Sequence, residues 1–122
     1  MQNYKELIVW QKSMDLVVEI YKLVKLLPKE KVYVLSDQMR RSAVSIPSNI
    51  AEGYGRSSTR EYIRFLKIAR GSCFELDTQI NTCVCIGYLK ESSVGFSFDL
   101  LNKIMKMLNS LVIKLNDRME PN

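Results

Sequence analysis

The sequence predicts an all-α protein, an antiparallel up-down four-helix bundle that forms one domain from residue 1 to residue 122. Three observations point to this fold class. Apolar residues recur every three or four positions in four long segments, which is the period of an amphipathic helix. No segment alternates between apolar and polar residues with the period of a strand, and the four segments are joined by short connections. A chain of this length can form one continuous core without a metal or a disulfide.

The first predicted helix covers residues 5–27. Its apolar line repeats with spacings of 3, 4, 3, 4 and 3 residues and consists of Leu7, Trp10, Met14, Val17, Tyr21 and Val24. Ile20 and Leu27 widen this line into the broader face that a helix in a bundle needs. Pro28 ends the helix, because the residue before a proline is disfavoured in the helical conformation.

The second predicted helix covers residues 34–52, and Gly53 is expected to form its C-terminal exit. Its core positions are Leu35, Met39, Ala43, Ile46 and Ile50. Pro47 lies inside this helix, where it removes one backbone hydrogen bond and clashes with the carbonyl of Ala43 at a cost of about 3 kcal/mol. The sequence therefore predicts a proline-kinked second helix.

A line of polar residues borders the core face of the second helix. Its members are Gln38, Ser42, Ser45, Asn49 and Glu52, again at spacings of 4, 3, 4 and 3. Two interpretations are open. The side chains either form hydrogen bonds across a helix interface or make up a solvated flank.

The third and fourth predicted helices cover residues 59–87 and 96–118. Ser58 or Thr59 can cap the third helix, and Glu61 lies in its first turn, where the helix dipole favours a carboxylate. The core line of the third helix is Tyr62, Phe65, Leu66, Ala69, Cys73, Leu76, Ile80 and Cys83. A loop containing Ser92 and Ser93 leads to the fourth helix, whose core line is Leu101, Ile104, Leu108, Leu111 and Leu115.

Five basic residues are assigned to one stripe along the third predicted helix. We call them the basic ridge: Arg56, Arg60, Arg64, Lys67 and Arg70. At 100° and 1.5 Å per residue they span an arc of about 120° and a length of about 21 Å. The planar guanidinium group of arginine suits bidentate contact with phosphate, and the net charge of +5 suits a polyanion. The ridge therefore indicates either a nucleic-acid-binding surface or a solvated face.

Apolar and aromatic residues near the basic ridge bear on this choice. Ile63 and Phe74 are expected to be exposed beside the ridge, where they indicate an oligomer interface. Tyr54 is a candidate for stacking on an unpaired base.

Catalysis is not expected. The chain has no histidine, which excludes histidine-dependent triads and histidine-ligated zinc sites. Glu52 and Glu75 could act as acids or metal ligands, but di-metal bundles combine carboxylates with histidines that this chain lacks. Cys73, Cys83 and Cys85 are interpreted as reduced packing residues. We therefore expect no enzyme activity, no cofactor and no metal. No membrane span or signal peptide is found, so a cytoplasmic location is expected.

Several short motifs resemble those of one family. They are Val9-Trp10-Gln11-Lys12, Gln38 followed by Arg40-Arg41, the run Ser45-Ile46-Pro47-Ser48-Asn49-Ile50-Ala51-Glu52-Gly53, Gly71-Ser72 with Glu75-Leu76 and Gln79, and Gly87-Tyr88-Leu89. Over about residues 4–115 the chain resembles the small bacterial four-helix-bundle proteins encoded in intervening sequences of large-subunit ribosomal RNA genes. Five residues are taken as the structural polar motif of this likeness: Ser45, Pro47, Asn49, Glu52 and Glu75.

The resemblance implies partners rather than chemistry. Proteins of this family are homo-oligomers, commonly ring-shaped pentamers, and the related accessory proteins of diversity-generating retroelements form basic barrels that engage nucleic acid and a reverse transcriptase. It implies no catalytic role for Asn49, Glu52 or Glu75. The expected function is therefore that of a non-enzymatic, homo-oligomeric bundle with a basic surface that binds RNA or DNA, with a nucleic-acid-processing protein as a further possible partner. The alternative is a protein-binding scaffold or assembly module with no nucleic-acid role.

Overall fold

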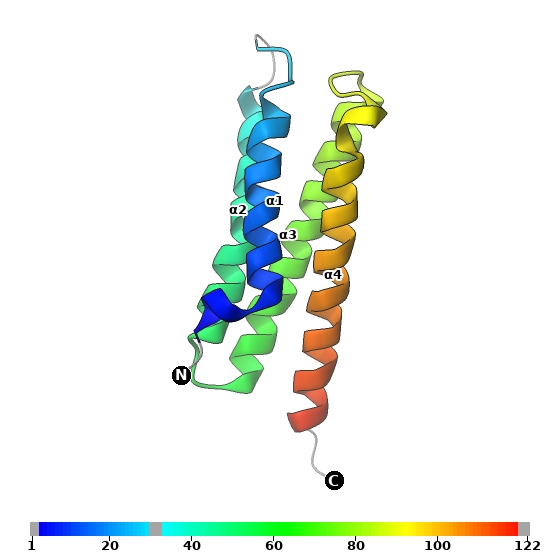
Figure 1. The fold of residues 1–122 in the computed structure, drawn as a ribbon. Helices are drawn as coiled ribbons and strands as arrows, with labels where there is room; N and C mark the ends of the chain where they lie inside the picture. The colour runs from blue at the N-terminus through cyan, green and yellow to red at the C-terminus, as the bar shows by residue number, and fades with distance from the viewer. Residues whose placement is uncertain (1–2, 30–32, 120–122) are drawn as a thin grey trace.

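The computed structural model of the protein describes residues 3–29 and 33–119. These residues form a short 3-10 helix, η1 (Tyr4–Glu6), and four α-helices, α1 (Ile8–Val24), α2 (Tyr33–Tyr54), α3 (Thr59–Cys85) and α4 (Glu91–Met119), and they include no strand. The prediction of an all-α protein with four helices is confirmed. In Figure 1 the chain ascends along α1, descends along α2, ascends along α3 and descends along α4, so consecutive helices run in opposite directions.

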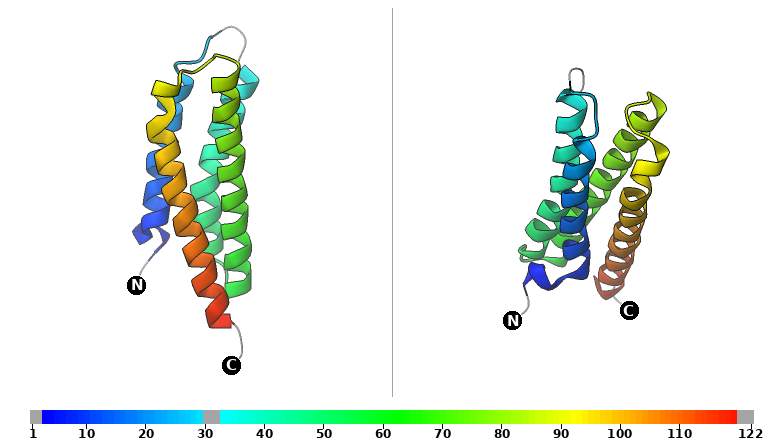
Figure 2. Two further views of the ribbon diagram at one scale, coloured as in Figure 1. Left: turned by 90° about the vertical axis from the view of Figure 1, so that its right-hand side faces the viewer. Right: turned by 45° about the horizontal axis from the view of Figure 1, so that its top comes forward.

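The helices are arranged so that each one packs against two neighbours. α2 packs on α1 and α3, and α4 packs on α3 and α1, whereas the backbones of the diagonal helices do not approach each other closely in the described ranges. The two further views in Figure 2 show the same arrangement from other sides. The core lies on the axis of the bundle, and no helix within residues 3–29 and 33–119 is long and apolar enough to span a membrane.

The observed helices differ from the predicted ones mainly at three ends. The first helix ends at Val24, three residues before the predicted end at residue 27. The first helix does not begin at residue 5, because η1 precedes it and Leu7 is extended with a ψ of 125°. The fourth begins at Glu91, five residues before the predicted start at residue 96. Its first turns bury Val94 and Ser97, and a Cβ at Gly95 would meet nothing within 4 Å. Packing thus overrides the low helix propensity of glycine and serine there.

The buried line of α1 also differs from the predicted one. The core positions are Val9, Ser13, Leu16, Ile20, Leu23 and Val24. The predicted residues Leu7, Trp10 and Val17 are only partly buried at the edge of the core. Met14 and Tyr21 are 38% and 44% exposed, so their assignment to the core was wrong.

Small residues are among those that α2 and α3 bury. They are Ser42, Ala43 and Gly53 on α2 and Ala69, Ser72 and Cys73 on α3. A Cβ on Gly53 would lie only 2.6 Å from the Cβ of Phe65. Gly53 therefore allows a close approach of the two helices, and it is not the expected exit, because α2 continues to Tyr54 and Gly53 has no positive φ.

Pro47 lies in the middle of this same helix. Its side chain is buried, and α2 continues through it as one element from Tyr33 to Tyr54. The bend expected at Pro47 stays a prediction.

Candidate functional site

The start of α3 sets the position of the basic ridge. Ser58 is the N-cap, with its hydroxyl oxygen accepting a hydrogen bond of 3.1 Å from the backbone N–H of Glu61. Capping by Ser58 and the place of Glu61 in the first turn agree with the sequence analysis. Arg60, Arg64, Lys67 and Arg70 lie on α3, whereas Arg56 lies in the connection before it. The helical arc predicted for five residues therefore holds for four of them.

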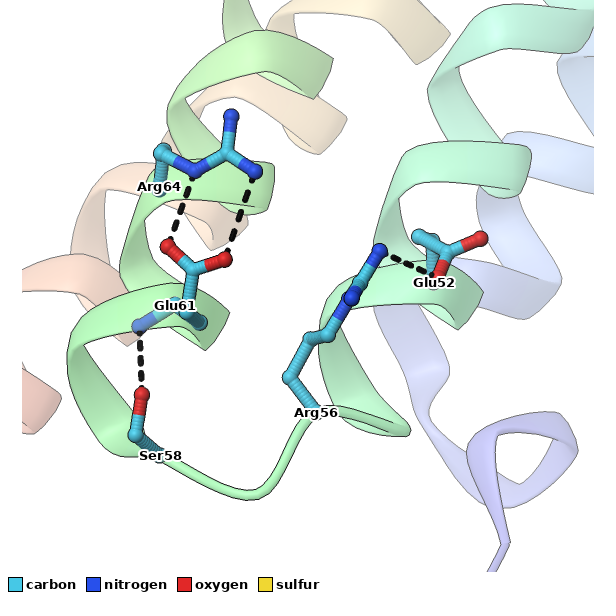
Figure 3. A network of polar contacts seen from close by, with 5 residues as sticks. All are labelled: Glu52, Arg56, Ser58, Glu61 and Arg64. Atoms are coloured by element: carbon cyan, nitrogen blue, oxygen red, sulfur yellow. Dashed lines mark hydrogen bonds and ion pairs between the residues drawn. The ribbon is translucent and has the colours of Figure 1, made fainter.

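Two arginines of the basic ridge are paired with carboxylates, as Figure 3 shows. Arg56 reaches back to α2 and lies 2.9 Å from Glu52. Arg64 donates two hydrogen bonds to Glu61, of 2.9 Å and 3.3 Å. The bond from Arg64 lowers the pKa of Glu61, and the same contact raises the pKa of Arg64. Both pairs are exposed, and the guanidinium groups are held in defined places by them.

The ring of Phe65 orients the same two arginines. The guanidinium carbons of Arg56 and Arg64 lie 4.8 Å and 4.5 Å from the centre of this ring. Phe65 is buried, so the two cations cover an aromatic side chain at the edge of the core. A cation–π contact attracts a cation without neutralising it. The arginines therefore keep their charge while their orientation is restricted.

The other three members of the basic ridge are placed differently. Arg70 donates a 2.8 Å hydrogen bond to the side-chain oxygen of Asn109, which links α3 to α4. Arg60 and Lys67 are exposed, and neither forms an ion pair within the described residues. The ridge thus presents five positive charges, of which Glu52 and Glu61 offset two.

The three residues expected to be exposed near the ridge differ in how far they are buried. Ile63 is 6% exposed and packs in the core of the monomer, so the expectation that it lies stranded on the charged face was wrong. Phe74 is 57% exposed. Tyr54 is half-buried with its ring edge-on to that of Tyr62 at 5.9 Å, so it is not the free stacking residue that was expected. Burial, with a smaller contribution from Tyr54, raises the pKa of Tyr62 to about 12.

The structural polar motif is divided between an interface and the surface. The hydroxyl oxygens of Ser45 and Ser72 lie 2.8 Å apart between α2 and α3. The amide of Asn49 donates to the Ser45 carbonyl at 2.8 Å and to the Ser45 hydroxyl at 2.9 Å. These contacts favour the interface interpretation for the centre of the polar line, where Ser42 is also buried.

The ends of the same polar line, Gln38 and Glu52, are exposed and fit the solvated interpretation. Glu75 is exposed and lines a shallow groove with Phe74, Thr78 and Gln79. The buried side-chain oxygen of Gln79 has no hydrogen-bond partner within the described residues.

Sequence reasoning missed the partners of the ridge arginines. The spacing of four residues between Glu52 and Arg56, and of three between Glu61 and Arg64, is the usual spacing of helical ion pairs and could have revealed both. The contacts of Arg70 with Asn109 and of Arg56 with Phe65 join different elements, and no local pattern encodes them.

The comparison with family models gives a match over most of the chain. Residues 5–110 match the model described as 23S rRNA-intervening sequence protein. The chain belongs to this family. This membership confirms the resemblance that the sequence motifs indicated. The family name refers to the location of the genes and identifies no ligand.

A solved structure supports the fold. The chain is similar to a protein of unknown function from the S23 ribosomal protein family of Bacteroides thetaiotaomicron, with a TM-score of 0.80 and 29% identity. The match covers 86% of this chain and 98% of that one. No curated protein matches the chain.

Proposed function

We propose that the protein is a cytoplasmic, non-enzymatic, self-associating bundle that binds RNA or DNA through the basic ridge. The observation that carries the proposal is the exposure of Arg60 and Lys67 on one helix with no carboxylate partner in the described residues. Arg56 precedes them in the sequence, Arg64 lies between them, and the guanidinium groups of both are oriented by the ring of Phe65. Surface cations of this kind supply the electrostatic, sequence-independent part of nucleic-acid binding.

The ion pairs lower the expected strength of this interaction but do not remove it. Exposed ion pairs contribute only about 0–1 kcal/mol, so a phosphate can compete for the same guanidinium groups. If Arg56 and Arg64 stay with their carboxylates, about three phosphates are neutralised per subunit. The log-log dependence of affinity on salt should then have a slope of about −2.7 on duplex DNA, against about −4.5 for five contacts.

The experiment is a binding titration of labelled structured RNA and duplex DNA across a salt series. The test variant, Arg60→Glu with Lys67→Glu, reverses the two ridge charges that have neither an ion pair nor a side-chain hydrogen bond within the described residues. The matched control, Lys103→Glu with Lys114→Glu, makes the same change of charge on exposed residues of α4. We expect the ridge variant to lose at least about tenfold in affinity and about 1.8 in slope, and the control to lose much less. If both variants lose the same affinity and slope, net charge alone explains the effect, and the ridge is not the binding site.

The self-association in this proposal is supported by Phe74. This large aromatic side chain is 57% exposed on α3, the helix that carries four of the five ridge residues, and contact with a second copy would cover it. A closed ring, five-membered as the family resemblance implies, would repeat the ridge around an axis and raise avidity through effective concentration. Phe74→Glu should lower the mass measured by light scattering and leave the basic ridge intact. If Phe74→Glu leaves the measured mass unchanged, Phe74 does not lie in the interface between subunits.

The alternative function is an assembly module without a nucleic-acid role. It is favoured by exposed apolar residues away from the ridge, such as Val18, Phe96 and Ile113, which are 55%, 63% and 61% exposed. Absence of binding at low salt by an assembled protein would make this alternative the better account.

A further inference from the structure

A pocket at the other end of the bundle is not part of the proposed function. It has a volume of about 450 Å³ and lies where the end of α1 meets the first turns of α2. It is lined by Val24, Lys25, Leu27, Lys29, Tyr33, Ser36 and Arg40. Ser36 and Glu52 are 16 residues apart on α2, which is about 24 Å along the helix. The pocket is therefore remote from the paired arginines of the basic ridge.

The charged residues that line this pocket are all cations. Lys25, Lys29 and Arg40 contribute three positive charges, and no described carboxylate lines it. Asp37 is close in sequence, but it pairs with Arg41 at 3.4 Å and does not line the pocket. The guanidinium group of Arg40 lies 5.8 Å from the centre of the Tyr21 ring, a contact that orients this cation without neutralising it. Like charges in one concave site repel one another, and an anion would relieve this repulsion.

Ser36 supplies a second, independent observation. Its side chain is only 9% exposed, and its hydroxyl makes no hydrogen bond within the described residues. The Ser36 oxygen is not one of the fully buried side-chain atoms without a partner, so it is open to the pocket and can donate a hydrogen bond to a ligand or to water there. A hydroxyl and three cations around one volume form a donor set suited to phosphate oxygens.

The remaining walls favour a phosphate that is attached to a planar ring. Val24 and Leu27 form a buried apolar wall, and Tyr33 presents an aromatic ring that is 79% exposed. Nucleic-acid bases stack on such rings, and the volume lies within the range of about 300–1,000 Å³ that is usual for small-molecule sites.

We infer that this pocket binds the phosphate of a nucleotide, with Lys25, Lys29, Ser36 and Arg40 as its donors and Tyr33 against the base. The phosphate can come from a free mononucleotide or from the 5′ end of a strand. The four donors and Tyr33 all belong to the residues that the structure describes. It does not depend on the basic ridge, so either proposal can fail alone.

The test is calorimetric titration of the full chain with inorganic phosphate, AMP and adenosine at low salt. We expect saturable binding of AMP, weaker binding of phosphate and none of adenosine. Arg40→Gln should weaken AMP binding by at least about tenfold, and Ser36→Ala by about threefold, because each removes one donor to the anion. Arg41→Gln is the matched control, since Arg41 is the adjacent arginine, lies outside the pocket and should change the affinity by less than about twofold.

Further variants and ligands separate the two proposals and the two phosphate sources. The ridge variant Arg60→Glu with Lys67→Glu should keep its affinity for AMP. Preference for a 5′-phosphorylated oligonucleotide over its unphosphorylated form would support the strand end, and preference for AMP over both would support the free nucleotide. The inference is overturned if AMP does not bind saturably at about 10 mM. It is also overturned if Arg41→Gln or the ridge variant weakens AMP binding as much as Arg40→Gln does.

Discussion

Ser45 and Ser72 join α2 to α3 through hydroxyl oxygens that lie 2.8 Å apart. Ser72 is 4% exposed, and Ser45 also accepts a hydrogen bond from Asn49. The pair therefore belongs to a small polar network between α2 and α3. Small side chains let the helix backbones approach closely, and the hydroxyl groups use that proximity to satisfy each other.

Removal of either hydroxyl should destabilise the protein, and removal of both should cost little more. Ser72→Ala and Ser45→Ala should each lower the free energy of unfolding by about 1 kcal/mol, because each leaves a buried or half-buried hydroxyl without its partner. The loss of unfolding free energy in the double variant should be well below the sum of the two single losses. Such a difference would show that the two hydroxyl groups are energetically coupled. Urea unfolding measures these values, with the exposed Ser48→Ala as the control. Additive losses would mean that the two hydroxyl groups act independently.

Alanine substitutions at Gly53 and at Gly71 should have opposite effects on the stability of the protein. A Cβ at Gly53 would lie 2.6 Å from the Cβ of Phe65 and 3.2 Å from the carbonyl oxygen of Tyr62, so Gly53→Ala should separate α2 from α3 and cost about 1–3 kcal/mol. A Cβ at Gly71 would meet nothing within 4 Å inside α3. Gly71→Ala should therefore stabilise by up to about 1 kcal/mol through helix propensity. Thermal unfolding of the two variants compares them directly, and stabilisation by Gly53→Ala would contradict the close approach.

The sequence predicted the fold well where one apolar line stands out, as in α3, and less well in α1, where two lines compete. The buried line of α1 contains Ser13, whose hydroxyl donates a 2.7 Å hydrogen bond to the carbonyl of Val9 one turn earlier. This local bond allows a polar residue inside the core, but in the sequence Ser13 interrupts the apolar pattern. The uninterrupted line through Met14 and Tyr21 therefore looked like the better core.

The candidate site was predicted as a set of residues but not as a network. Spacing along α3 correctly grouped its four cations on one helix, since helical periodicity alone fixes that grouping. It could not show that Ile63 faces the core or that Arg70 bonds to Asn109 on another helix. These features depend on how α3 is rotated against its neighbours.

Stability should fall at alkaline pH because of Cys73. Burial raises the pKa of this thiol from its ordinary value of 9.0 to about 12. Above pH 9 the unfolded chain loses the thiol proton while the folded chain keeps it, so the folded state is disfavoured by up to about 1.4 kcal/mol per pH unit until about pH 12. The raised pKa of Tyr62 acts in the same direction above pH 10.

Urea unfolding between about pH 8 and pH 11 measures this dependence. Cys73→Ala should be less stable at neutral pH, because it leaves a cavity, but should show a shallower decline with pH. The control is Cys85→Ala, which alters an exposed thiol and should keep the slope of the parent protein. Identical slopes in all three proteins would assign the alkaline loss to other groups.

Neutralising Glu61 should strengthen the binding of nucleic acid by the basic ridge. Glu61→Gln releases the guanidinium group of Arg64 from a bidentate ion pair and adds one uncompensated positive charge. The salt dependence should become steeper by about 0.9, and the affinity at low salt should rise at least about threefold. Glu75→Gln is the matched control, because it makes the same change of charge at an exposed position of α3 that has no ion pair within the described residues. Tighter binding by Glu61→Gln alone would place phosphate at Arg64, whereas equal gains in both variants would show that only the net charge matters.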